Sequence, residues 1–75
     1  MPSPEPRATV EVSINGKRRQ VPADLSLTRL LGWLDIPLDR VAIELNRVIV
    51  PKPRWAESRL MGGEEIEIVH FVGGG

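Results

Sequence analysis

The sequence contains no cysteine, no tyrosine, one phenylalanine and one histidine. The absence of cysteine excludes a disulfide framework and a thiolate metal site, so sulfur chemistry cannot use a thiol of this chain. The lone histidine, His70, belongs to no recognisable nucleophile motif and cannot form a metal site by itself. We therefore expect His70 on the surface of a strand, and we predict no catalytic residue and no metal ligand in the chain.

Balanced charge and short apolar runs limit the possible partners. Ten Lys and Arg residues balance ten Asp and Glu residues, so the formal net charge is zero. A neutral chain has no overall electrostatic attraction to nucleic acid or to an anionic membrane. No apolar run approaches the roughly 20 residues that span a bilayer, and the first residues do not resemble a secretory signal. We expect a cytoplasmic chain that binds neither nucleic acid nor membrane.

The length of the chain and its charged clusters argue against a free-standing enzyme. A domain of 75 residues is too small to enclose a large catalytic cavity as well as a core. Glu64, Glu65 and Glu67 are interpreted as a turn and the solvated face of a strand rather than an acidic catalytic cluster. Lys17-Arg18-Arg19 is interpreted as a solvated edge rather than a nucleic-acid patch. No glycine-rich phosphate loop joins a strand to a helix, so we expect no ATP site.

The first half of the chain predicts a hairpin followed by a helix. Apolar and polar residues alternate over Thr9–Ile14, and Asn15-Gly16 is the strongest short indication of a type I′ hairpin turn. The turn returns the chain as a second strand over Lys17–Val21, and Pro22 ends it. Ser26 is a suitable N-cap for a helix that continues to about Leu34. One face of this helix is apolar and consists of Leu27, Leu30, Leu31 and Leu34.

The second half predicts three more strands and little helix. The strands are expected at Val41–Asn46, Val48–Val50 and Glu65–Val72. Between the last two, one helical turn is expected within Lys52–Leu60, followed by a turn at Gly62-Gly63. Both tryptophans, Trp33 and Trp55, are expected in the core or close to it.

This order of elements predicts an α+β domain of two layers. A mixed sheet of four to five strands would pack on one main helix, whose apolar face covers one side of the sheet. If the strands before and after the helix are parallel, their connection should be right-handed. We expect residues 1–7 to be a disordered proline-rich tail, residues 8–72 the folded domain, and residues 73–75 a flexible glycine tip.

The last three residues, Gly73-Gly74-Gly75, are the candidate functional group. Glycine has no Cβ, so such a segment can enter a narrow channel of another protein or be bound by strand addition. An extended segment from Phe71 to Gly75 reaches roughly 15 Å. A terminal carboxylate is ionised at neutral pH and is a poor acyl donor, so another enzyme must activate it. Phe71 either packs back on the domain or anchors a partner, and the sequence leaves both open.

One pattern in the second half is more specific. The segment from Ala42 to Pro51, followed by Arg54-Trp55, contains Asn-x-x-x-Val-Pro-x-x-x-Trp. Together with Leu60, the segment Gly63–Val69 and the terminal Gly74-Gly75, this pattern resembles the sulfur carriers of thiamine biosynthesis, the ThiS family. The resemblance covers residues 10–75 and implies a ubiquitin-like β-grasp fold.

The resemblance also implies a function, in which the chain is a protein co-substrate and not an enzyme. A ThiF-like adenylyltransferase would use ATP to adenylate the carboxylate of Gly75. A sulfur donor such as a cysteine desulfurase would then convert it to a thiocarboxylate, and thiazole synthase would receive the sulfur. Gly75 would be the modified residue, while the residues expected to bind partners are Gly74, Gly73, Val72 and Phe71. The chain would bind no cofactor itself, and we expect a monomer when it is free.

Two departures and two alternatives accompany this resemblance. The family does not usually need Gly73, and the proline-rich segment before Ala8 is additional. The small subunit of molybdopterin synthase shares the fold and the terminus, but it usually lacks the Val-Pro…Trp segment. A different class is also open: a ubiquitin-like modifier joined to other proteins through Gly75, or a plain interaction module.

Overall fold

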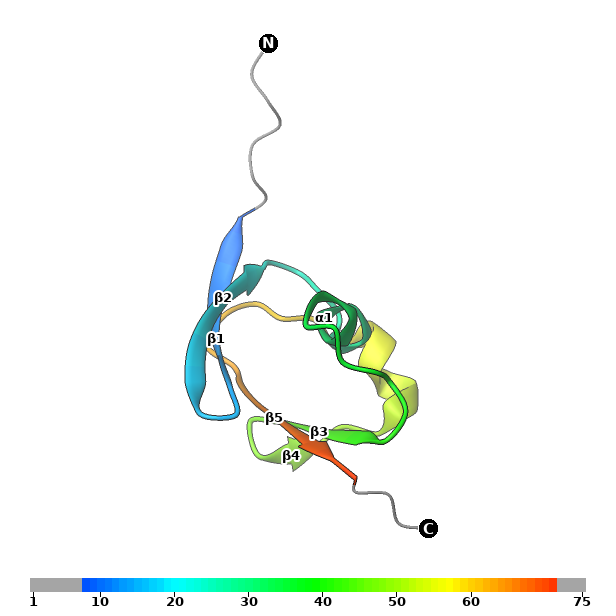
Figure 1. The fold of residues 1–75 in the computed structure, drawn as a ribbon. Helices are drawn as coiled ribbons and strands as arrows, with labels where there is room; N and C mark the ends of the chain where they lie inside the picture. Colours follow the sequence, from blue (N-terminus) through cyan, green and yellow to red (C-terminus); the bar gives the residue numbers. More distant parts are fainter. Residues whose placement is uncertain (1–7, 72–75) are drawn as a thin grey trace.

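The computed structural model describes residues 8–71 as a five-stranded mixed sheet with one α-helix and a 3₁₀ helix (Figure 1). The elements are β1 (Thr9–Ile14), β2 (Lys17–Pro22), α1 (Leu27–Trp33), β3 (Val41–Leu45), β4 (Val48–Ile49), η1 (Lys52–Glu57) and β5 (Glu65–His70). The strand order is β2-β1-β5-β3-β4, in which β1 and β5 are parallel and the other pairs antiparallel. The predicted α+β architecture, a mixed sheet with one main helix, is confirmed.

The first hairpin forms where the sequence predicts it. Asn15 and Gly16 have φ values of 50° and 85°, the positive values that a type I′ turn needs at both central positions. The turn places Ile14 opposite Lys17 and Val12 opposite Arg19. Most of β2 is exposed, and its basic residues form the solvated edge that the sequence predicts.

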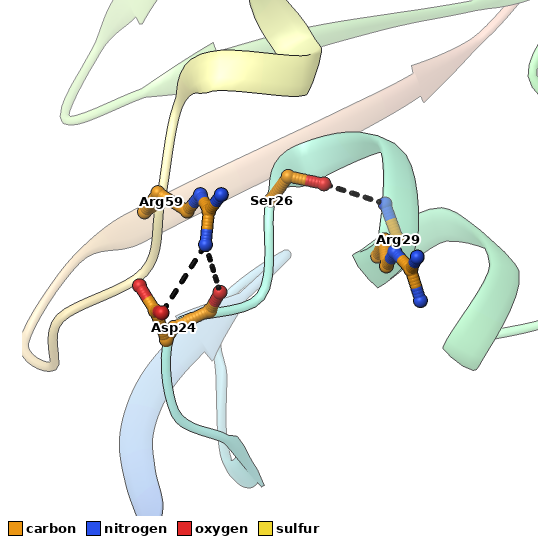
Figure 2. Close-up of polar contacts among 4 residues, drawn as sticks. All are labelled: Asp24, Ser26, Arg29 and Arg59. Carbon is orange, nitrogen blue, oxygen red and sulfur yellow. Dashed lines mark hydrogen bonds and ion pairs between the residues drawn. The ribbon is translucent and has the colours of Figure 1, made fainter.

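The helix also begins as predicted. Ser26 has an extended backbone conformation, and its Oγ accepts a 3.1 Å hydrogen bond from the backbone N–H of Arg29 (Figure 2). This bond satisfies one of the free N–H groups of the first turn. The helix ends at Trp33, and Asp35 takes a positive φ of 62° ahead of Pro37, which could not continue the helix.

The core lies between the sheet and the helices, and it contains one of the two tryptophans. The buried apolar side chains come from every element except β4 and are those of Val12, Val21, Leu27, Leu30, Leu31, Val41, Ile43, Trp55, Leu60, Ile66 and Ile68. The prediction for Trp55 is confirmed, whereas the prediction for Trp33 is wrong because 44% of Trp33 is exposed. Trp33 lies at the edge of the leucine face, where Arg19 stacks over its ring at 5.2 Å from the centroid.

Three strands are shorter than the sequence predicts, and one of them is β4, which ends at Ile49 instead of Val50. Strand β3 ends at Leu45 because Asn46 and Arg47, with φ of 52° and 69°, form a second tight turn into β4. Strand β5 ends at His70, which pairs with Val41, the first residue of β3. The residue before β3, Arg40, has a positive φ of 72°, so the chain there does not continue the strand. Val72, predicted as the last strand residue, lies outside the described residues.

Candidate functional site

Strand β5 is the element that leads to the glycine segment. It lies in the middle of the sheet, parallel to β1 on one side and antiparallel to β3 on the other. Two of its side chains, Ile66 and Ile68, are buried under the helix layer and fix its position. The base of the candidate site is therefore held by the centre of the fold rather than by a loop.

Phe71 stands at the point where the described structure ends. Its backbone N–H donates a 2.8 Å hydrogen bond to the carbonyl oxygen of Arg40, which holds the backbone in line with β5. Its side chain is nevertheless 57% exposed and lies outside the core. Val69, two residues earlier in β5 and opposite Ala42, is 48% exposed. Of the two readings of Phe71, the described structure favours an apolar side chain available to a partner.

The other four predicted residues of the site, Val72, Gly73, Gly74 and Gly75, lie outside the described residues. The structure thus places the base of the site at His70 and Phe71 and tests none of the roles assigned to the residues beyond them. His70 is exposed at the end of β5, as expected from the sequence.

Asn15 ties the first hairpin to β5 through its side chain. Its Nδ2 donates a 3.2 Å hydrogen bond to the carbonyl oxygen of Ile68, and its Oδ1 accepts a 2.7 Å hydrogen bond from the N–H of Ile68. The backbone N–H of Asn15 also donates to the carbonyl oxygen of Ile66 at 2.8 Å. The side-chain amide therefore pairs with β5 as one more peptide group of β1 would. Sequence reasoning assigned Asn15 only to the turn, because nothing in the sequence indicates a partner 53 residues away.

Replacing Asn15 by glycine is expected to lower the free energy of unfolding by about 1–3 kcal/mol. Glycine tolerates the positive φ, so the change isolates the side-chain bonds to Ile68, a residue that is 4% exposed. The matched control is Asn46→Gly, because Asn46 has a similar φ and its Oδ1 accepts from the N–H of the exposed residue Glu65 at 2.9 Å. Water can replace that bond, so we expect a smaller loss. Urea denaturation measures the free energy of unfolding of both variants. Equal losses of stability would contradict the claim that the bonds from Asn15 to Ile68 stabilise the fold more than the bond from Asn46 to Glu65 does.

The residues of the Asn-x-x-x-Val-Pro-x-x-x-Trp pattern have structural roles in the described part of the chain. Asn46 forms the β3–β4 turn and binds the first residue of β5 through its side chain. Pro51 precedes η1, where its fixed φ suits a helix start. Trp55 is 3% exposed, and its Nε1 donates a 2.8 Å hydrogen bond to the carbonyl oxygen of Val50. The pattern therefore connects β3, β4, η1 and β5.

The acidic cluster is also accounted for structurally. Both carboxylate oxygens of Glu64 accept hydrogen bonds, from the backbone N–H groups of Met61 at 2.7 Å and Gly62 at 2.8 Å. Glu65 is exposed and lies 3.6 Å from Arg47, and Glu67 is exposed on β5. Within residues 8–71 there is no group of His, Asp and Glu side chains arranged to hold a metal ion. The interpretation of these residues as a turn and a solvated strand face is confirmed.

A groove of about 890 Å³ opens where β1 begins and α1 starts. Figure 2 shows its polar residues: Arg59 Nη1 donates to a carboxylate oxygen of Asp24 at 3.1 Å and to the Asp24 carbonyl oxygen at 3.2 Å. Since β1 and β5 are parallel, the start of β1 lies at the opposite end of the sheet from the end of β5. The groove is therefore separate from the candidate site. No helix in the described part of the chain has the length and apolar character needed to cross a bilayer.

Comparisons with known sequences agree with the pattern of residues described above. The model of the ThiS family matches residues 12–75. The chain is 39% identical over 66 residues to a thiazole synthase from Paramagnetospirillum magneticum, an alignment that covers 88% of this chain and 20% of that protein. It is 37% identical over 65 residues to the sulfur carrier protein ThiS of Bacillus subtilis, with 85% of this chain and 98% of that protein covered. The chain thus spans one fifth of the first relative and almost all of the second.

A solved structure shows the same fold. The crystal structure of a thiamine biosynthesis protein (ThiS) from Geobacter metallireducens matches with a TM-score of 0.77 and 28% sequence identity, covering 88% of this chain and 100% of that chain. The five-stranded sheet and its helix therefore form the ubiquitin-like β-grasp that the sequence pattern predicts.

Proposed function

The chain belongs to the ThiS family, and from this membership we propose that it is a sulfur carrier that delivers sulfur for thiazole formation in thiamine biosynthesis. The carboxylate of Gly75 is the group that is modified. The chain itself contributes no catalytic residue and binds no cofactor. Its partners are a ThiF-like adenylyltransferase, a persulfide donor such as a cysteine desulfurase, and thiazole synthase.

The chemistry requires activation of the carboxylate before sulfur can be attached. A carboxylate oxygen attacks the α-phosphorus of ATP, so that pyrophosphate leaves and an acyl-adenylate forms at Gly75. The terminal sulfur of a persulfide then attacks the acyl carbon, and AMP leaves. A thiol cleaves the resulting S–S bond, and the sulfur stays on Gly75 as a thiocarboxylate. ATP and reduced thiols are available together in the cytoplasm, where we place this exchange.

The observation that carries the proposal is family membership combined with the geometry of β5. The strand is held in the centre of the sheet and runs toward the segment that contains Gly75, with Phe71 exposed at its end. The match to one fifth of a thiazole synthase supports thiazole synthase as the sulfur acceptor, because a carrier-like segment occurs within that relative.

Intact-mass spectrometry tests this function directly. The purified chain is incubated with a ThiF-like adenylyltransferase, ATP, a cysteine desulfurase, cysteine and a thiol reductant. We expect a mass gain equal to the exchange of one oxygen atom for sulfur, located at Gly75 by fragmentation. The gain should disappear when ATP is omitted. An unchanged mass under complete conditions would contradict the proposal.

The same experiment separates the alternatives. A covalent ladder on other proteins, joined through Gly75, would indicate a protein modifier instead of a carrier. Transfer of the sulfur to a molybdopterin precursor, with none to thiazole synthase, would indicate a carrier of the molybdopterin type.

A further inference from the structure

The turn between β1 and β2, Asn15-Gly16, contains a pair of residues that can react with each other. Asparagine is thermolabile, and an asparagine before glycine cyclises readily because the glycine nitrogen attacks the side-chain carbon Cγ without hindrance from a side chain. Both residues are exposed, and the space where a Cβ of Gly16 would lie is empty. Among the turn and loop bonds of residues 8–71, none is made by the N–H of Gly16. The attacking nitrogen is therefore free and accessible to water.

The side-chain amide of Asn15, by contrast, is held in place by β5. Its Nδ2 donates to the carbonyl oxygen of Ile68 at 3.2 Å, and its Oδ1 accepts from the N–H of Ile68 at 2.7 Å. Ring closure makes Cγ tetrahedral and brings it within bonding distance of the Gly16 nitrogen. A planar amide that is bound at both ends cannot make this change, so the two hydrogen bonds must open before the reaction can start.

The same two bonds are the last that join β1 to β5 in the part of the chain that the structure describes. The strands are in register at Ile14 and Ile66, and the backbone N–H of Asn15 donates to the carbonyl oxygen of Ile66 at 2.8 Å. Beyond this point the positive φ of Asn15 directs the main chain into the hairpin turn (Figure 1). Only the side chain of Asn15 continues the pairing as far as Ile68.

We propose that Asn15 is a site of spontaneous deamidation, that its hydrogen bonds to Ile68 slow the reaction, and that the reaction weakens the attachment of β5 to β1. The nitrogen of Gly16 loses its proton to water or hydroxide and bonds to Cγ of Asn15. The Cγ–Nδ2 bond then breaks, and ammonia leaves. Water opens the cyclic imide at either of its carbonyl carbons, which gives aspartate or isoaspartate at position 15. The reaction consumes water and needs no oxidant, reductant or enzyme.

Both products weaken the contact with Ile68. The carboxylate of an aspartate is ionised at neutral pH and can only accept hydrogen bonds. One of its oxygens would take the place of Nδ2 and face the carbonyl oxygen of Ile68, so that two acceptors repel each other. Isoaspartate also adds a methylene group to the main chain, which does not fit the two positive φ values of the type I′ turn. We expect the larger effect from isoaspartate.

The first test compares deamidation in the folded and the unfolded chain. The purified chain is kept at mildly alkaline pH in buffer or in guanidinium chloride, and circular dichroism verifies the state of each sample. Peptide mapping by mass spectrometry locates the exchange of NH2 for OH. We expect deamidation at Asn15 to be at least about tenfold slower in the folded chain, because two hydrogen bonds must open first. Equal rates in the two states would overturn the proposal.

Asn46 is the matched control within the same chain. It has a similar positive φ, but the next residue is Arg47, whose side chain hinders attack by its own backbone nitrogen. In guanidinium chloride, where no fold protects either residue, we expect Asn46 to deamidate more slowly than Asn15. A rate at Asn46 as high as that at Asn15 would contradict the assignment of Asn15-Gly16 as the reactive pair.

Amide hydrogen exchange tests whether the bonds to Ile68 control the reaction. The N–H of Ile68 donates to the Asn15 side chain, so the same local opening should limit its exchange and the deamidation of Asn15. When guanidinium chloride is raised below the unfolding transition, the two rates should increase together. Deamidation that stays constant while the exchange of Ile68 accelerates would refute this control.

The effect on β5 is measured on the isoaspartate product. Deamidation adds a negative charge to a chain whose formal net charge is zero, so chromatography can separate the product from the unmodified chain. We expect the N–H of Ile68 to exchange about tenfold faster in the product. Unchanged exchange would overturn the weakening of β5. None of these results depends on sulfur transfer, so their failure would leave the proposed function intact, and failure of that function would leave the deamidation site intact.

Discussion

Replacing Trp55 by alanine is expected to lower the free energy of unfolding by about 3–5 kcal/mol. Trp55 is 3% exposed in the core, and its Nε1 donates a 2.8 Å hydrogen bond to the carbonyl oxygen of Val50. The substitution leaves a cavity and removes the donor that satisfies this carbonyl. A domain of 75 residues has a stability of about 4–11 kcal/mol, so one side chain accounts for much of it.

The measurement is chemical denaturation followed by circular dichroism, with the melting temperature as a second readout. The melting temperature of Trp55→Ala should fall by roughly 12–40 °C. Trp33→Ala is the matched control, because Trp33 is 44% exposed and makes a surface contact with Arg19. We expect that control to lose only about 1 kcal/mol. Similar losses for the two tryptophans would show that burial does not distinguish them.

Trp55→Phe separates packing from hydrogen bonding. Phenylalanine keeps an aromatic ring in the core but has no donor for the carbonyl oxygen of Val50. We expect it to lose about 1–3 kcal/mol, less than the alanine variant. A loss as large as that of Trp55→Ala would mean that the hydrogen bond, and not the ring, provides most of the stabilisation.

Local sequence rules predict much of this fold because several elements are set by short-range chemistry. Asn15-Gly16 adopts the positive φ values that its composition favours, and Ser26 caps the helix that begins beside it. The spacing of Leu27, Leu30 and Leu31 predicts the buried face of that helix. Each of these features depends on residues that lie only a few positions apart in the sequence.

The features that the sequence does not predict depend on residues far apart in the chain. The bonds from Asn15 to Ile68 join two strands that become neighbours only in the folded sheet. The exposure of Trp33 depends on how α1 is rotated against the sheet. Leu30 and Leu31 face the core, whereas Trp33 lies just beside this buried face and is exposed. A turn at Asn46-Arg47 is likewise hard to predict, because arginine seldom adopts the positive φ found there.

The Asn-x-x-x-Val-Pro-x-x-x-Trp pattern, which relates the chain to its family, therefore stabilises the fold. The proposed chemistry takes place at Gly75, outside this pattern. Asn46 lies in the β3–β4 turn, where its side chain binds the first residue of β5, and Trp55 lies in η1, where its side chain is buried in the core. The candidate site at the end of β5 depends on this support, because Ile66 and Ile68 fix the strand that leads to it. Variants of the pattern should thus act through stability, and variants of the glycine segment should act through chemistry.

Deletion of Gly75 is expected to abolish measurable thiocarboxylate formation while the fold remains unchanged. Without Gly75 the reacting carboxylate is moved to Gly74, about 3.5 Å short of its position in the wild-type chain. A displacement of even 1 Å in a reacting group can reduce a rate about 100-fold. The measurement is the rate of acyl-adenylate formation with the adenylyltransferase, followed by pyrophosphate release, with intact mass to identify the product.

Two further variants test whether the absence of side chains matters as well as the length. Gly74→Val places a branched side chain next to the reacting carboxylate and should lower kcat/KM strongly, because the enzyme must enclose this segment closely. Gly73→Ala should cause a smaller loss, since the family pattern does not require a glycine there. Lys17→Ala, on the exposed edge strand β2, is the control for a surface substitution outside the glycine segment. If the chain without Gly75 forms the thiocarboxylate at the wild-type rate, then the sulfur is carried equally well on Gly74, and the expected requirement for Gly75 is wrong.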